Sequence, residues 1–315
     1  MQFLLLSFTL WLISILFYMY AMRRNLNVST VVSLIISLLF LFSGLNPLSM
    51  PVELCFSLAM NTLYRRSSIP FLVVIAISSF IQFYSVYSAI SMQVFLLAAG
   101  TGMAVSMIFN DELKKMVSVN DSTRGKNPVV EKRRDIVQIA SGVLFILIFP
   151  EISKTLSYSG MVFLGVISIF ILDILSFNVQ NGFSRMVSSL ERPNVPVGIG
   201  SIWYISGLMI LMGLTSSTDI ILIGVFAMAI GDSLATIVGI SIRTIRLPYS
   251  RKKSLGGLMA MMFPTLVFAY LISGMTYFPL AIGASLVESA SGYPLDDNFS
   301  IPVGIIVISY ILSIF

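Results

Sequence analysis

Residues 3–22 read FLLLSFTLWLISILFYMYAM, a run of 20 apolar or small side chains without one Asp, Glu, Lys or Arg. The stretch Ile69–Ile90 is equally free of charged residues. A helix of about 20 such residues crosses the hydrocarbon core of a bilayer, which is roughly 30 Å thick. Both stretches therefore predict transmembrane helices.

The rest of the chain has the same composition. Of its 315 residues, 57% are hydrophobic and only 10% are charged, whereas soluble domains carry roughly 25% charged residues. We expect an all-α, polytopic transmembrane helix bundle with roughly 9–12 crossings. The candidate spans lie near 2–22, 28–46, 50–64, 69–90, 92–109, 136–150, 158–177, 197–216, 219–240, 256–275, 276–290 and 301–315.

The basic residues predict the orientation of the bundle. If the N-terminus is outside and every candidate span crosses, 18 of the 19 Lys and Arg residues fall inside, and only Lys154 falls outside. Basic residues concentrate in cytoplasmic loops of membrane proteins. The net charge of +5 therefore reflects orientation, and it does not indicate nucleic-acid binding because no basic–aromatic interleaving accompanies it.

The residue types that are missing exclude several kinds of chemistry. The chain has no histidine and a single cysteine, Cys55. This excludes His-based triads, His-ligated zinc, Cys clusters and internal disulfides. Carboxylates, Lys, Arg, hydroxyls and a hard cation such as Mg²⁺ remain available.

The longest polar stretch of the chain is a predicted cytosolic loop at 111–135. It separates the N-terminal spans (1–110) from a predicted catalytic region (136–315).

Among the carboxylates that fall within predicted spans, Asp173 and Asp232 are the two clearest cases. Ionisable residues at membrane depth are costly and usually functional, although some are packed, hydrogen-bonded structural groups. Asp232 adjoins a stripe of small residues, Gly231, Ala235 and Gly239, whose spacing of four allows another helix to approach closely. We therefore regard Asp232 as the stronger functional candidate.

The polar segment 243–257 follows that span. It has no acidic residue and five basic ones, Arg243, Arg246, Arg251, Lys252 and Lys253. Ser254 is a predicted N-cap for the next helix, and Gly256 and Gly257 are expected to leave backbone N–H groups accessible there. A helix start with free N–H groups beside Lys side chains suits a phosphate. Anchoring to anionic lipid headgroups is the alternative interpretation.

The most acidic stretch lies near the C-terminus and comprises Glu288, Asp296, Asp297, Asn298 and the following Pro302. Acidic side chains attract Mg²⁺, so Asp232 and Asp297 would share one cation site if their spans pack together. The chain contains no Walker motif, protein-kinase motif set or nucleophile elbow. A phosphotransferase of this composition would have to belong to a membrane-specific class.

These motifs resemble one known family. Gly231-Asp232-x-x-Ala235-x-x-x-Gly239, followed by a basic loop ending Lys253-Ser254-x-Gly256-Gly257, resembles the polyprenol kinases. That family includes dolichol kinase, phytol kinase and CTP-dependent diacylglycerol kinase, and it is distantly akin to phosphatidate cytidylyltransferases. Three further matches follow in family order over residues 130–315: Glu131-Lys-Arg133-Arg134, Glu191 before two glycines, and Glu288 followed by Asp297-Asn298 and Pro302. Two positions depart from the family pattern, Gln138 in place of a frequent His and Gly256 in place of a frequent Glu.

The resemblance implies transfer of the γ-phosphoryl group of CTP to a long-chain isoprenoid alcohol of the dolichol type at the cytosolic face. Under it, Asp232, Asp297 and Asn298 would hold Mg²⁺, and Asp232 or Asp173 would accept the alcohol proton. The phosphate-binding residues it implies are Lys252, Lys253, Ser254, Gly256, Gly257 and Arg134. Expected partners are CTP, the alcohol and membrane lipids, without nucleic acid.

Two other functions stay open from the sequence. A CDP-lipid synthase would use the same nucleotide and cation on a phospholipid. A transporter or flippase would also show short spans, glycine interruptions and intramembrane carboxylates, but no pair of matching halves is visible and the polar residues gather at one face. The compact chain favours a prokaryotic plasma membrane over the endoplasmic reticulum.

Overall fold

The computed structural model describes residues 2–21, 27–42, 48–62, 74–75, 89–109, 128–155, 199–242, 244–250, 253–292 and 296–314. Within these residues every regular element is a helix, and the one β-type pairing is an isolated bridge between Arg246 and Ser254. The expectation of an all-helical protein is therefore confirmed for the described part of the chain. Its helices group into two compact units, residues 1–124 with 156–214 and residues 125–155 with 215–315.

Unit 1 contains five described helices, α1 (Gln2–Ala21), α2 (Val28–Phe42), α3 (Ser49–Thr62), α5 (Ala89–Phe109) and α10 (Ile199–Leu214). Helix α5 packs against both α3 and α10. Small polar side chains join these apolar helices: Ser33 bonds Ser57 at 2.5 Å between hydroxyl oxygens, and the Asn61 amide donates to the Ser29 hydroxyl at 3.2 Å. Small residues and interhelical hydrogen bonds commonly hold apolar helices together in membranes.

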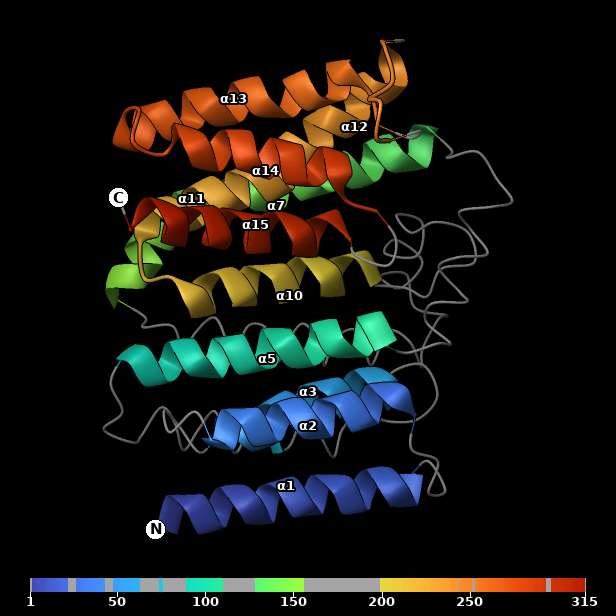
Figure 1. Ribbon diagram of the computed structural model, residues 1–315, viewed down its shortest axis with the longest axis vertical. Helices are drawn as coiled ribbons and strands as arrows, with labels where there is room; N and C mark the ends of the chain where they lie inside the picture. The colour runs from blue at the N-terminus through green and yellow to red at the C-terminus, as the bar shows by residue number, and fades with distance from the viewer. Residues whose placement is uncertain are drawn as a thin grey trace. The chain divides into compact units, whose positions relative to one another are not determined.

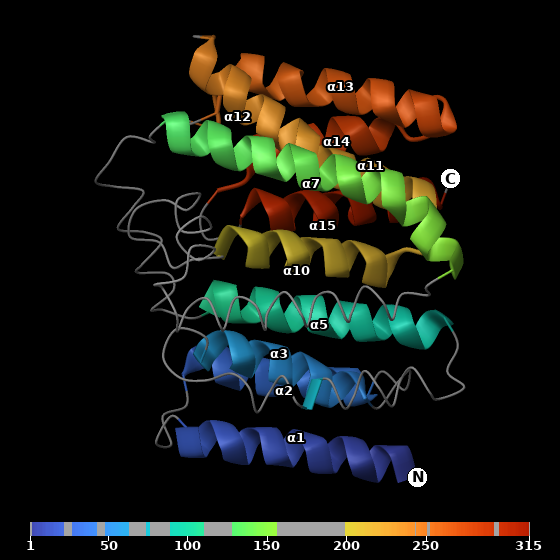
Figure 2. The ribbon, with the colours of Figure 1, turned by 180° about the vertical axis from the view of Figure 1, so that it is seen from behind.

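Unit 2 contains the candidate site. Its helices are α7 (Pro128–Thr155), α11 (Thr218–Phe226), the π-helical turn η1 (Ala227–Gly231), α12 (Asp232–Ser241), α13 (Leu255–Ser273), α14 (Phe278–Ala290) and α15 (Asp297–Leu312). Helices α11, η1 and α12 form one continuous run. Helix α13 contacts both α12 and α14, and α14 packs on α15, as Figures 1 and 2 show from opposite sides. Helix α7 contacts η1.

Two helical runs of unit 2 are long and apolar enough to cross a membrane, Thr218–Ser241 and Leu255–Ser273. They match the spans expected at 219–240 and 256–275. Among the described residues, six further apolar helical stretches are 10–17 residues long. The number of crossings and the outside position of the N-terminus stay predictions, and most of the spans expected at 69–90 and 158–177 lies outside the described residues.

Two helices begin earlier than the hydropathy indicates. Helix α7 starts at Pro128, so the end of the expected 111–135 loop is helical; proline suits a first helical turn and Glu131 follows near the positive helix end. Helix α15 starts at Asp297 rather than near 301, because Asp296 caps it by accepting from the Asn298 N–H. In both cases a polar first turn extends the helix beyond its apolar part.

The two compact units do not coincide with the regions divided by the polar stretch. Helix α10 falls in the region 136–315, yet it groups with the N-terminal helices of unit 1. The catalytic role of the region 136–315 stays a prediction. All residues of the candidate site described below belong to unit 2.

Two glycines of unit 2 predict opposite effects on stability. A Cβ on Gly142 of α7 would lie 2.2 Å from the Ala229 Cβ of η1, whereas a Cβ on Gly239 of α12 would meet only the Ser254 hydroxyl at 3.6 Å. We expect Gly142→Ala to lower the free energy of unfolding by about 1–3 kcal/mol through overpacking. Gly239→Ala should be neutral or stabilising by up to about 1 kcal/mol through helix propensity. Thermal unfolding of the two variants in detergent, compared with the unmodified protein, checks this; equal midpoints would contradict the close packing of α7 on η1.

Candidate functional site

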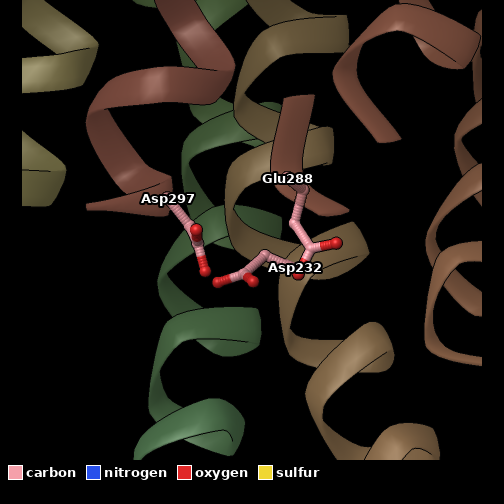
Figure 3. A group of neighbouring side chains, drawn as sticks. All are labelled: Asp232, Glu288 and Asp297. Atoms are coloured by element: carbon pink, nitrogen blue, oxygen red, sulfur yellow. The ribbon is translucent and has the colours of Figure 1, made fainter. Parts of the chain in front are cut away.

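Three carboxylates from three different helices converge in unit 2. Asp232 begins α12, Glu288 lies in the last turn of α14, and Asp297 begins α15. One oxygen from each lies within 4.8 Å of the other two, and Figure 3 shows the three side chains pointing toward one another. Asp232 and Glu288 are buried, and Asp297 is partly exposed. We call these three residues the carboxylate cluster.

The π-helical turn η1 sets the position of Asp232. The Asp232 N–H donates to the Ala227 carbonyl five residues earlier, where a regular α-helix would bond four residues back. The Ser233 hydroxyl donates to the Ala229 carbonyl at 2.7 Å and lies within the same widened turn. Single π turns inside α-helices occur frequently at functional sites. The turn shifts the register of α12 at the residue that the sequence singles out.

The stripe of small residues on this run faces α13, as a close helix approach requires. A Cβ on Gly231 would lie 3.0 Å from Met261 Cγ, and a Cβ on Gly257 of α13 would lie 3.0 Å from the Ala235 carbonyl oxygen. Gly239 faces Ser254 at ordinary contact distance. The close approach of α13 places the start of that helix, and the loop before it, beside Asp232.

That loop contributes a cation to the cluster. The Lys253 ammonium donates to Glu288 Oε1 and to Asp297 Oδ2, the latter at 2.9 Å. Burial lowers the pKa of this ammonium, but the three carboxylates, led by Asp297, outweigh burial and raise the pKa above its usual value. Lys253 therefore carries a positive charge at neutral pH. Three carboxyl groups thus surround one ammonium group in the cluster.

The described residues of this loop, 244–250 and 253–254, pair as a hairpin beside the cluster. The Leu247 N–H donates to the Lys253 carbonyl at 3.1 Å, and the Leu255 N–H donates to the Ile245 carbonyl at 2.9 Å. The Tyr249 and Ser289 hydroxyls bond to each other at 2.8 Å and tie the hairpin to α14. The position of Lys253 is thus fixed by the backbone bond to Leu247 and by the side-chain bonds to Glu288 and Asp297.

The start of helix α13 shows that the expected accessibility of the Gly256 and Gly257 N–H groups is wrong. Ser254 is the N-cap, as predicted, and its hydroxyl accepts from the Gly257 N–H at 3.3 Å. The Gly256 N–H donates to the Thr244 hydroxyl at 2.9 Å. The N–H groups of Gly256 and Gly257 are therefore not accessible, because the cap and the folded hairpin already use them. A phosphate at this turn would have to replace the two hydroxyl partners.

Arg134 and Asn298 lie beside the cluster rather than in it. Arg134 Nη2 is 3.8 Å from Glu131 Oε2. Burial and the neighbouring Asp297 raise the pKa of Asp296, and the positive charge of Arg134 partly offsets that rise. The Asn298 amide nitrogen donates to Asp296 Oδ1 at 2.8 Å. The Asn298 amide oxygen accepts from the Gln138 amide at 3.3 Å. The metal role of Asn298 stays a prediction.

Three predicted site residues, Asp173, Glu191 and Lys252, lie outside the described residues. Two contributions that the structure shows were not predicted. Glu288 was noted only as a motif position, and its approach to Asp232 depends on the packing of α14 against η1 and α13. Gln138 was noted only as a departure from a family pattern, and its contacts connect residues 90 and 160 positions away in the chain.

The donor set of the carboxylate cluster fits a hard divalent cation. Mg²⁺ prefers carboxylate and phosphate oxygens and usually keeps several waters. Three carboxylate oxygens within 4.8 Å of one another supply such ligands. The fold and the cluster together define an apolar helical protein with an acidic, lysine-bearing site.

Comparison with known proteins points to one kind of enzyme. The chain is 27% identical over 205 residues to a probable phytol kinase 1, chloroplastic, of Glycine max, covering 56% of this chain and 65% of that protein. It is 24% identical over 239 residues to a probable phytol kinase, chloroplastic, of Zea mays, covering 66% of this chain and 76% of that protein. The match thus spans just under two thirds of the soybean protein's length. No family model matches the chain, and no solved structure matches it.

Proposed function

We propose that this protein is a membrane-embedded kinase that transfers the γ-phosphoryl group of CTP to a long-chain isoprenoid alcohol. The observation that carries the proposal is the convergence of Asp232, Glu288 and Asp297 with Lys253 at one end of an apolar helix bundle. The similarity to two plant proteins named as phytol kinases supports the same class of reaction. A dolichol-type polyprenol and phytol are the two acceptor classes to compare.

The residues of the cluster would divide the work of phosphoryl transfer. Enzymes of this kind act through positioning and charge neutralisation rather than covalent chemistry. The cluster would hold Mg²⁺, which when bound would neutralise charge on the nucleotide phosphates. Lys253, held within reach of Glu288 and Asp297, would add a positive charge on the phosphate side. Arg134 lies near the same end of unit 2 and would contribute a second one.

In the proposed reaction, the alcohol oxygen forms a bond to the γ-phosphorus of CTP. The bond between the γ-phosphorus and the β–γ bridging oxygen breaks, and CDP leaves with that electron pair. The hydroxyl proton passes to a carboxylate. Asp173 and Asp232 are the sequence candidates for this role, and of the two the structure describes only Asp232, in the buried part of the cluster.

We further propose that the cluster lies at the cytosolic face of the membrane. The basic hairpin and the basic start of α7 both belong to this end of unit 2, and basic residues concentrate on the cytoplasmic side. CTP is a cytosolic solute, whereas the alcohol is confined to the bilayer. A site at the inner ends of apolar helices would meet both substrates.

Transfer of label from two positions of CTP tests the proposed function. Purified protein receives Mg²⁺, a mixture of polyprenols, phytol, diacylglycerol and phosphatidate, and CTP labelled at either the γ- or the α-phosphorus. We expect lipid label only from the γ position, in an isoprenoid phosphate. Label only from the α position would establish CDP-lipid synthesis instead. No lipid label from folded protein would reject both enzymes and favour transport.

Glu288 offers a test of the cation role within this proposal. Glu288→Gln keeps the shape of the side chain but removes one of three charged ligands. We expect the Mg²⁺ concentration for half-maximal transfer to rise about tenfold or more, because hard cations bind amide oxygens less strongly than carboxylates. Titration of transfer against Mg²⁺ measures this. The matched control is Glu151→Gln on the exposed surface of α7, which should leave the Mg²⁺ requirement unchanged.

A further inference from the structure

The side chain of Gln138, on α7, lies between the two turns that precede Asp232 and Asp297. Its amide nitrogen donates to the Met228 carbonyl of η1 at 2.8 Å and to the Asn298 amide oxygen of α15 at 3.3 Å. Both partners are acceptors, so the –NH₂ end of the amide must face them. The carboxylate cluster as described contains no atom of α7, yet α7 contacts the elements on both sides of it.

The bond from Gln138 gives the Met228 carbonyl, in the π turn, a hydrogen-bond partner. In a regular α-helix the Met228 carbonyl would accept the Asp232 N–H. Here that N–H donates to Ala227 instead, and the Met228 carbonyl accepts from Gln138. An unpaired buried carbonyl would be costly, so Gln138 stabilises the widened turn that sets the position of Asp232.

The bond to Asn298 reaches the second aspartate. The Asn298 amide also donates to Asp296 Oδ1 at 2.8 Å, and Asp296 Oδ1 accepts from the Asn298 N–H at 3.0 Å. Asp296 is the N-cap of α15, whose first residue is Asp297. Through Asn298, Gln138 therefore stabilises the capping turn that sets the position of the Asp297 side chain.

We propose that Gln138 is a positioning residue that holds the Asp232 and Asp297 carboxylates at the mutual distance a divalent cation requires. The inference rests on the proposed function for the identity of the cluster as a Mg²⁺ site. It assigns Gln138 no contact with the ion or the substrates. Residues that orient metal ligands through hydrogen bonds typically change metal affinity or activity by about 10–100-fold when replaced.

The test measures cation binding directly, without turnover. Mn²⁺, which accepts the same oxygen ligands, is titrated into purified protein and followed by the loss of the free-ion electron paramagnetic resonance signal. Gln138→Met keeps the length of the side chain and removes its donor. We expect its Mn²⁺ dissociation constant to rise about 10–100-fold. Gln138→His retains an N–H donor and should recover part of the affinity.

Ser141→Ala is the matched control, because among the described residues the Ser141 hydroxyl donates to the Gln138 carbonyl of its own helix. It should bind Mn²⁺ as the unmodified protein does. Unchanged Mn²⁺ affinity in Gln138→Met, with or without a lower unfolding temperature, would overturn the positioning role and leave a purely structural one. Absence of Mn²⁺ binding in the unmodified protein would overturn it as well.

The proposed function can fail separately from this inference. An unmodified protein that transfers no phosphoryl group but binds Mn²⁺, and loses affinity in Gln138→Met, would reject the kinase and keep the positioning role. If the unmodified protein transfers the γ-phosphoryl group and Gln138→Met binds Mn²⁺ with equal affinity, the kinase is supported and the positioning role is rejected.

Discussion

Asp232→Asn is expected to reduce γ-phosphoryl transfer by at least about a thousandfold, the upper range for loss of one charged or polar group at a reacting centre. The change removes a buried carboxyl group from the carboxylate cluster but preserves the shape of the side chain. Because Glu288 and Asp297 lie within 4.8 Å of Asp232, the loss also relieves repulsion between like charges. The unfolding temperature should therefore stay the same or rise while transfer is lost.

This opposite behaviour of activity and stability separates a functional carboxylate from a structural one. A packed, hydrogen-bonded carboxylate would lose stability on amidation and retain turnover. The matched control is Asp219→Asn, in the first turn of α11 at the other end of the same continuous helical run, about 20 Å away along the helix axis. Asp219→Asn should transfer at the normal rate. Normal transfer by Asp232→Asn would reject the assignment of this site.

Local patterns in the sequence were enough to predict the helices that carry the site. The apolar runs at 219–240 and 256–275 match two continuous helices, because a long apolar segment has few alternatives to a helix in a bilayer. The spacing of Gly231, Ala235 and Gly239 placed one face of the run against α13. Ser254 was recognisable as a cap because its side-chain chemistry is local.

Features that depend on distant residues could not be predicted in the same way. The π turn before Asp232 lies in the apolar segment 227–231, whose residue types show no irregularity. The N–H group of Gly256 seemed accessible because its partner, Thr244, lies twelve residues earlier across a folded hairpin. Glu288 joined the cluster only through helix packing. Sequence reasoning thus found two of the three carboxylates and missed the geometry that brings all three together.

Lys253→Met should separate two roles of the site. Removing the ammonium takes one positive charge away from the carboxylates that it contacts, so a divalent cation should bind more tightly. Transfer should nevertheless fall about 100- to 1,000-fold, because the positive charge proposed to act on the nucleotide phosphates is gone. Because the Lys253 side chain is a quarter exposed, we expect a loss of about 1–3 kcal/mol in the free energy of unfolding without cation, between surface and buried pairs.

Three measurements on one preparation check this prediction: transfer, Mn²⁺ affinity and thermal unfolding with and without Mg²⁺. Mg²⁺ should raise the unfolding temperature more in Lys253→Met than in the unmodified protein, since it replaces the lost positive charge. Lys132→Met removes the same charge from an exposed position on α7 and should change none of the three. Weaker cation binding in Lys253→Met would mean that Lys253 organises the carboxylates rather than balancing their charge, and its proposed action on phosphate would then lose its electrostatic basis.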